Sequence, residues 1–455
     1  MGWLDKLFGR EEKKKAPAAP VITGEPFAGL EGIRFGRYSD NNKSYKKTMR
    51  WYEAEDRYKE KAYAETFAAL FDYITDEAEG NVTFKQDGQT FTFELIQGSK
   101  KVYGRCDGEY IVAEAPIAIM EKPSNAVMRR LLEMNFSLFY SRCAMDDKGT
   151  LRMVFDSSVI TASPNKVYYG LREVAKFADR QDELLLSDFS TLKSIETEHV
   201  QPLPELEIEV KYKYFRKWIQ DILDRTTGLN ADSFSGAIAY AFLTLLYRID
   251  FLIIPEAKLL ADLEEISSHY WTKKDETPIV ERNAMMREGI RKLLNISLGD
   301  FRKGVYRSKG TFAITPVPPM DKVRENVQAG NKDAQWYMDN KYPELALVLN
   351  EYGMAYNQFA YSMPAIITEL TTIYMAVMHA DFFRDLGMQH MFYNPETKTF
   401  DKDRITYAID KVTAKWYDKY QSMKWDHNRI EYTSLWDFGH TFSEQVVGLN
   451  LEVKR

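Results

Sequence analysis

The stretch 81–97, NVTFKQDGQTFTFELIQ, decides the fold of the first half of this chain. Apolar and polar residues alternate on both sides of Asp87-Gly88. An Asp-Gly pair between two alternating runs is the strongest short-range signal for a β-hairpin. The run that follows, 100–117, KKVYGRCDGEYIVAEAPI, predicts a third strand and contains a second Asp-Gly pair.

Helical patterns alternate with these hairpins along the first half of the chain. We predict helices over 44–75, 124–135 and 165–189, and a second hairpin over 136–157. The order is therefore helix, three strands, helix, two strands, helix. Because single strands and helices do not alternate, this order predicts an antiparallel sheet with packed helices, an α+β fold.

A break at 196–205, which contains two prolines, separates this part from a second half with an almost purely helical pattern. The sequence therefore predicts an N-terminal segment and linker over 1–43, an α+β domain over 44–195 and a mainly helical domain over 205–455. One short strand, GTFAITPV at 310–317, interrupts the predicted helices. These helices span 207–226, 234–254, 256–270, 278–296, 320–329, 331–339, 343–361, 364–386, 402–421 and 431–447.

Two of these helical stretches are apolar enough to be tested as membrane spans. The stretch 237–254 contains Arg248 and Asp250, and the stretch 363–378 contains Pro364 and Glu369. A membrane span needs about 20 mostly apolar residues with few charges. We therefore interpret both stretches as buried helices.

The overall composition narrows the class of function. The net charge is -6, whereas nucleic-acid-binding proteins usually carry a basic excess, so we expect no nucleic-acid partner. Only two cysteines occur, which favours a reducing compartment, and the first residues lack the features of a secretory signal peptide. We therefore expect a cytoplasmic protein.

The first ten residues, MGWLDKLFGR, place apolar side chains at helical spacing opposite Lys6 and Arg10. Such a segment is compatible with weak peripheral contact with an anionic membrane, or with an exposed terminus or a short docking helix. All three interpretations stay open. The apolar residues are Trp3, Leu4, Leu7 and Phe8.

The run 125–159 and the helix pattern after it resemble the type III secretion chaperone fold and the related YbjN-like domains of bacteria. In that family a helix is followed by a hairpin with an acidic-Gly turn, and a last helix packs across the sheet. The resemblance covers roughly residues 60–190, and the second half of the chain matches no family in this way. The matching residues are Leu131, Leu132, Asn135, Asp146, Asp147, Gly149, Leu151 and Phe155.

This resemblance implies a non-catalytic domain that forms homodimers and holds extended segments of other proteins on apolar surface. An antiparallel sheet with an open edge or face can accept a strand or an apolar segment from a partner. We expect the binding surface on the sheet and on the 125–135 helix. The predicted partner-binding residues are Phe91, Phe93, Val127, Leu131, Phe136, Phe139 and Tyr140.

Signatures of catalysis and of metal or cofactor binding are lacking in the sequence. No phosphate-binding loop, dinucleotide fingerprint, HExxH or GxSxG motif occurs. His379, Asp381 and His390 come closest to a metal motif, but two residues spaced two apart face different sides of a helix. Cys106 and Cys143 fall in predicted strands, where a small apolar core residue is the simpler interpretation. We therefore expect no catalytic residue, cofactor or metal ligand.

The sequence thus favours a bacterial protein-binding module of chaperone or adaptor type. Two alternatives remain: an enzyme with a site dispersed over the helical domain, or a structural subunit of a larger assembly. Aromatic residues crowd the C-terminal segment, where a helical core is favoured over an interface. These residues are Trp416, Tyr417, Tyr420, Trp425, Tyr432, Trp436, Phe438 and Phe442.

Overall fold

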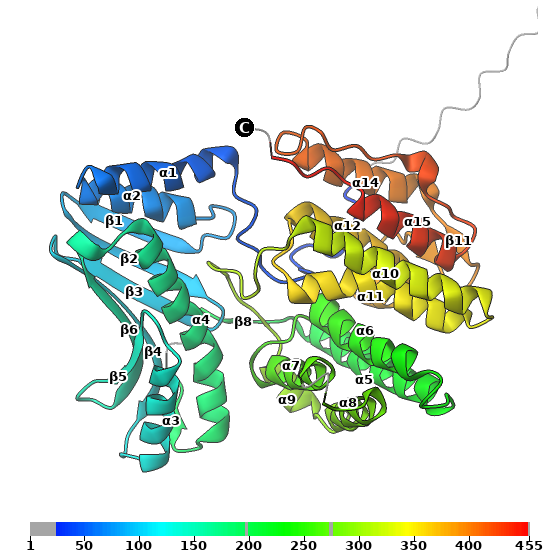
Figure 1. Ribbon diagram of the computed structural model, residues 1–455, viewed down its shortest axis with the longest axis horizontal. Coiled ribbons are helices and arrows are strands. Elements are labelled where there is room, and N and C mark those ends of the chain that lie inside the picture. The colour runs from blue at the N-terminus through cyan, green and yellow to red at the C-terminus, as the bar shows by residue number, and fades with distance from the viewer. Residues whose placement is uncertain (1–23, 196–198, 273–275, 454–455) are drawn as a thin grey trace, which may run out of the picture.

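The computed structural model describes residues 24–195, 199–272 and 276–453. An α+β region forms one side of the molecule and a mostly helical region forms the other, so the predicted fold class is confirmed (Figure 1). The N-terminal apolar residues proposed for membrane contact, Trp3, Leu4, Leu7 and Phe8, lie outside the described residues.

The α+β region consists of one antiparallel sheet with helices packed against it. The strand order is β1-β2-β3-β4-β6-β5, and the short strand β7 pairs with β4. The strands are β1 (Val82–Asp87), β2 (Thr90–Gln97), β3 (Lys100–Cys106), β4 (Tyr110–Met120), β5 (Arg142–Met145), β6 (Thr150–Ser158) and β7 (Leu192–Lys193). The helices are α1 (Tyr45–Lys59), α2 (Tyr63–Ile74), α3 (Asn125–Phe136) and α4 (Pro164–Asp188).

Two details of the predicted element order are wrong. The run expected as a third strand is a second hairpin, because Gly108 adopts a φ of 96° and turns the chain between β3 and β4. The helix expected over 44–75 is broken at Lys61, whose φ of 63° is incompatible with a right-handed helix. Each difference arises from the backbone conformation of one residue, which hydrophobic periodicity does not predict.

One face of the sheet is apolar and covered, and the other is polar and exposed. Burial alternates along β2, so Phe91 and Phe93 face inward while Thr92 and Glu94 face outward. Helix α2 covers the inner face of β2, where Phe71 lies 4.4 Å from Phe93 between ring centroids. Helix α4 lies across β3, β4 and β6. The apolar face of the sheet therefore forms the core of the region.

The helical region is built from α5 to α15 and short strand pairs. Helix α6 passes through its core, between α5, α8 and α11 (Figure 1). Its helices are α5 (Glu205–Thr227), α6 (Ser235–Ile253), α7 (Ala257–Trp271), α8 (Ile279–Leu293), α9 (Leu298–Lys303), α10 (Met320–Asp339), α11 (Pro343–Ala360), α12 (Ala365–Met378), α13 (Ala380–Asp385), α14 (Lys402–Trp416) and α15 (Leu435–Val447). The short pairs are β8 (Gln201–Pro202) with β9 (Tyr306–Arg307), and β10 (Tyr393–Asn394) with β11 (Thr399–Phe400).

Several helix boundaries differ from the prediction. The runs 320–329 and 331–339 form the single helix α10, and the run 364–386 is broken at His379 into α12 and α13. The strand predicted at 310–317 is wrong. This segment bends at 311–312 and at 314–315, so it forms no ladder beyond the bridge between Gly98 and Lys309.

Helix α6 is the one helix among the described residues that is long and apolar enough to cross a membrane. In the folded chain, 89% of its apolar window is buried. Its two charges are also neutralised inside the protein, because Arg248 pairs with Glu351 and Asp250 pairs with Arg37. It is accordingly the core helix of this region, as the charges in its sequence predict.

The described part of the predicted linker, from residue 24 onward, packs against the helical region. Phe27 and Phe35 contact its core, and the Gly36 amide donates to the carbonyl of Phe251 at 2.8 Å. The Arg37 side chain reaches Asp250 at 2.7 Å. This segment runs between the two regions and forms part of their junction.

Candidate partner-binding site

The structure separates the seven predicted partner-binding residues into two groups. Phe91, Phe93, Val127 and Leu131 are buried in the core of the α+β region, so their assignment to a partner surface is corrected. The physical reason is that the apolar faces of β2 and α3 pack into this core. Phe136, Phe139 and Tyr140 are exposed, and they lie together at the end of α3.

These exposed residues, which lie close together in sequence at the end of α3 and in the loop after it, are here called the aromatic patch. The Phe136 side chain is 97% exposed and that of Phe139 is 91% exposed. Leu132 lies one helical turn before Phe136 on the outer face of α3 and is also exposed. The aromatic patch consists of Leu132, Phe136, Phe139 and Tyr140.

The loop that carries the aromatic patch is fixed by one carboxylate, that of Glu173 on α4. Its two oxygens accept hydrogen bonds from the amides of Phe139, Tyr140 and Ser141 at 2.7–3.0 Å. The Ser141 hydroxyl donates a fourth bond at 2.8 Å. These bonds hold the loop with its aromatic rings turned away from the core.

The sheet edge beside the aromatic patch is closed to strand addition at one position. The Asn135 amide side chain accepts from the Cys143 amide at 2.6 Å and donates to the Cys143 carbonyl at 3.3 Å. It thereby satisfies the backbone groups on the outer edge of β5, which an added strand would need. The aromatic patch therefore offers side-chain surface, and the expected open strand edge is blocked at Cys143.

A second site on the α+β region is already filled by the chain itself. Residues 309–314, here called the strap, leave the helical region and cross to the α+β region. The Phe312 ring is 1% exposed, belongs to the core of the α+β region, and packs edge-on against Tyr168 at 5.3 Å. The sequence did not indicate this site, because Phe312 and its neighbours are distant in the chain.

The residues around the strap form what we call the strap groove: Gln97, Gly98, Tyr168, Arg172 and Lys176. The Gln97 side-chain oxygen accepts from the amides of Thr311 and Phe312 at 3.1 and 2.9 Å. The Gly98 amide donates to the Lys309 carbonyl at 2.8 Å. The strap groove thus binds mainly the backbone of the strap.

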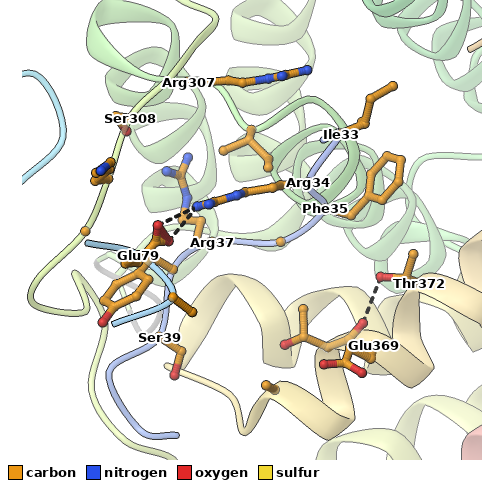
Figure 2. Close-up of a pocket in the computed structure, with 18 of the residues that line it drawn as sticks. Ile33, Arg34, Phe35, Arg37, Ser39, Glu79, Arg307, Ser308, Glu369 and Thr372 are labelled. Atoms are coloured by element: carbon orange, nitrogen blue, oxygen red, sulfur yellow. Dashed lines mark hydrogen bonds and ion pairs between the residues drawn. The ribbon is translucent and has the colours of Figure 1, made fainter. Parts of the chain in front are cut away.

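Between the two regions lies a cleft with a volume of about 910 Å³ (Figure 2). Arg34 spans it and pairs with Glu79 through both carboxylate oxygens. Arg307 pairs within the helical region, with Glu207 at 2.7 Å. Both arginines thus already have carboxylate partners, but only the Arg34 pair connects to the α+β region.

Buried acidic residues of α4 line the junction on the side of this cleft. Burial raises the pKa of Glu183 to about 9, and the charge of Asp182 adds to this rise. The Tyr306 hydroxyl donates to Glu183 at 2.8 Å. Burial and the charge of Glu256 raise the pKa of Asp179 well above its ordinary value. The shift of the Glu183 pKa to about 9 favours the protonated form of this carboxyl group at neutral pH.

A smaller cavity of about 260 Å³ lies within the helical region, and a buried charged triad borders it. Glu351 accepts two hydrogen bonds from Arg248, at 2.7 and 2.8 Å, and lies 3.0 Å from Nε2 of His379. Burial acts to raise the pKa of Glu351, but Arg248 and His379 lower it to about 2. Burial lowers the pKa of His379, which outweighs the effect of Glu351.

The candidate metal motif does not assemble. His379 contacts Glu351, Asp381 pairs with Arg384 at 2.8 Å, and His390 is exposed. Within the described ranges, no three His, Cys, Asp or Glu side chains converge as metal ligands. Both cysteines are buried, and burial raises the pKa of Cys143 to about 11, which disfavours the thiolate.

The C-terminal aromatic residues divide between core and surface. Phe438 and Phe442 are buried in the helical core, with ring centroids 5.2 Å apart, whereas Tyr417 is exposed. Comparison of the chain with protein-family models and with curated proteins finds no match.

Proposed function

We propose that this chain is a non-catalytic protein-binding module, chaperone- or adaptor-like, which holds a segment of a partner protein on the aromatic patch. One observation carries the proposal: two phenylalanine rings, Phe136 and Phe139, are almost fully exposed on a loop that Glu173 holds in place. A contiguous exposed apolar patch marks interaction sites in soluble proteins. Aromatic residues contribute a large share of binding energy at interfaces.

The fixed conformation of the loop supports a binding role for the exposed rings. A loop that is already ordered loses little conformational entropy on binding, so more of the contact energy appears as affinity. Glu173 supplies this order through four hydrogen bonds. The chaperone-type resemblance, a cytoplasmic location in a bacterium and a homodimer belong to the same proposal.

The proposal is tested by placing a photo-crosslinking amino acid at Phe139 in the full chain, within its native cell. We expect one defined partner to be crosslinked, and Phe136→Ser to abolish the product. A matched control is Trp336→Ser on α10, which removes another exposed aromatic ring and leaves the aromatic patch unchanged. Crosslinks only between copies of this chain would assign the patch to a homodimer, and their complete absence would refute the proposal.

A second candidate function, an enzyme, is favoured by the cavity beside His379. Glu351 orients one ring nitrogen of His379, and a neutral histidine oriented in this way is suited to accept a proton. A small-molecule screen by thermal shift separates the two functions. Compounds that stabilise the wild type but not His379→Gln would favour the enzyme, while an unchanged compound profile would remove its support.

A further inference from the structure

The strap groove holds the strap mainly through the backbone groups of the strap. Backbone amides and carbonyls of the strap make most of the polar contacts, to Gln97, Gly98, Arg172 and Lys176. The Thr311 hydroxyl adds a bond to the Ile96 carbonyl at 2.7 Å. Main-chain hydrogen bonds give affinity to any segment of suitable shape, and side-chain pockets then provide selectivity.

The side-chain requirement is concentrated at two strap positions. Phe312 fills an apolar socket beside Tyr168, so an aromatic residue is favoured there. Gly310 lies against the Tyr38 ring, and a Cβ at this position would come within 2.5 Å of that ring. The groove therefore selects a small residue followed, two positions later, by an aromatic one.

The end of the groove carries positive charge that the strap does not neutralise. Arg172 donates to the Ala313 carbonyl at 3.3 Å, and Lys176 donates to the Ile314 carbonyl at 2.8 Å. Among the described residues, neither cation has an ion-pair partner within 4.0 Å. The Nε atom of Arg172 is buried without a hydrogen bond.

One carboxylate offsets this charge only in part. Asp40 acts on Lys176 without forming an ion pair within 4.0 Å, and it accepts a hydrogen bond from the Tyr168 hydroxyl at 3.1 Å. Arg180, one turn further along α4, pairs with Glu264. Burial, with the charge of Arg172, lowers the pKa of Lys176 to about 8. A carboxylate brought to this position would relieve the cost of keeping both cations charged.

We propose that the strap groove is a binding site for a partner segment that follows the path of the strap and in which an aromatic residue is followed, within two positions, by Asp or Glu. The strap is the chain's own occupant, and such a segment displaces it. The strap has Ala313 and Ile314 where the partner would carry its carboxylate. This site lies on a different face of α4 from the aromatic patch, and the inference does not depend on the function proposed for the patch.

Displacement of the strap is a competition between an attached and a free segment. Attachment gives the strap an effective concentration in the millimolar range, so a free peptide of the same sequence cannot compete well. A carboxylate that reaches Arg172 and Lys176 adds a charge-assisted hydrogen bond that the strap cannot form. A segment with this carboxylate should therefore displace the strap better than a free peptide with the sequence of the strap.

The test measures binding of two fluorescein-labelled peptides to the full chain. One peptide copies residues 307–316, and the other differs by Glu in place of Ile314. In the variant Phe312→Ala the socket is empty, and we expect the strap to be held less tightly. For this variant we expect the acidic peptide to bind about tenfold more tightly than the copy of the strap. The wild type should bind both peptides more weakly.

The charge requirement is tested by adding Arg172→Met and Lys176→Met to the Phe312→Ala variant. This change should remove the preference for the acidic peptide while leaving binding of the strap copy. Because Phe312→Ala could impair folding, Thr311→Pro provides a second route. It removes the amide that donates to Gln97 but keeps the ring in the chain. We expect the same order of affinities.

Two results would overturn the inference. One is equal affinity of both peptides, or no binding, in a released variant whose circular dichroism matches the wild type. The other is a preference for the acidic peptide that survives loss of both cations. Phe136→Ser with Phe139→Ser should leave peptide binding unchanged, so failure here is distinguishable from failure of the function proposed for the aromatic patch.

Discussion

Helix α4 contributes to two aromatic sites that differ in burial: the aromatic ring at one is buried, and the rings at the other are exposed. On one face Tyr168 and Arg172 border the groove in which Phe312 is buried. On the other face Glu173 holds the loop from which Phe136 and Phe139 project into solvent. The same helix thus supports one aromatic site that the chain fills itself and one that the described residues leave open.

This difference shows that exposure of an aromatic residue is not a property of its sequence neighbourhood. Both sites contain phenylalanine beside small or polar residues. Phe312 is covered because α4 contributes Tyr168 to its socket and Gln97 at the end of β2 accepts a hydrogen bond from its backbone amide. Phe136 faces outward because α3 already buries its other side through Val127 and Met134. Substitutions at each site should change stability and hydrogen exchange to different extents.

The largest effect is expected when the filled socket is emptied. Phe312→Ala should lower the free energy of unfolding by about 3–5 kcal/mol, because a fully buried ring is lost and a cavity remains. Urea denaturation followed by circular dichroism measures this change. A decrease below about 1 kcal/mol would mean that the ring contributes little to folding, and the contrast between the two sites would be lost.

The free energy of unfolding should also depend on pH, through Glu183 on α4. The folded pKa of Glu183, about 9, lies above its ordinary value of 4.5. Its contribution to stability is therefore complete below pH 4.5 and is lost as the pH rises toward 9, with a slope of at most about 1.4 kcal/mol per pH unit. The slope of stability against pH should be smaller in Glu183→Gln. An unchanged slope would show that Glu183 does not titrate in this range.

A moderate effect is expected on the open face of α4. Glu173→Gln keeps the shape of the side chain but removes the charge that binds three amides, which should cost about 1–3 kcal/mol locally. Hydrogen exchange should become faster at Phe139, Tyr140 and Ser141, while the strands of the sheet keep their protection. Equal protection in both proteins would show that the loop is held by other contacts.

The smallest effect on stability is expected from the aromatic patch itself. Phe136→Ser combined with Phe139→Ser should change the free energy of unfolding by no more than about 0.5 kcal/mol, because these rings are solvated in the folded chain. Thermal melts of the two proteins should nearly coincide. A large loss of stability would mean that the rings are packed, which would remove the basis of the proposed partner site.

Local sequence predicted much of the fold because its signals act over short distances. The Asp-Gly turn at Asp87-Gly88 and the alternation along β2 predicted the first hairpin. The charges inside α6 predicted a buried helix and not a membrane span. Such features depend on backbone geometry and on periodic burial, which neighbouring residues determine together.

The candidate sites were predicted only in part, because side-chain burial depends on distant segments. Phe136, Phe139 and Tyr140 were correctly placed at the surface, but Phe91 and Phe93 are covered by α2. Periodicity identifies the apolar face of a strand, yet it cannot say whether a helix or a partner covers that face.

The sequence by itself determined the α+β class, the hairpins at Asp87-Gly88 and at 136–157, and most of the helices. Only the tertiary structure decided that the strap lies in a groove between Gln97 and Lys176, residues that are 215 and 138 positions away from their partners in the strap. It also decided that Asn135 closes the edge of β5 and that Glu173 fixes the exposed loop. These contacts join side chains to backbone groups, and nearly every residue has the same backbone amide and carbonyl, so no sequence pattern marks them in advance.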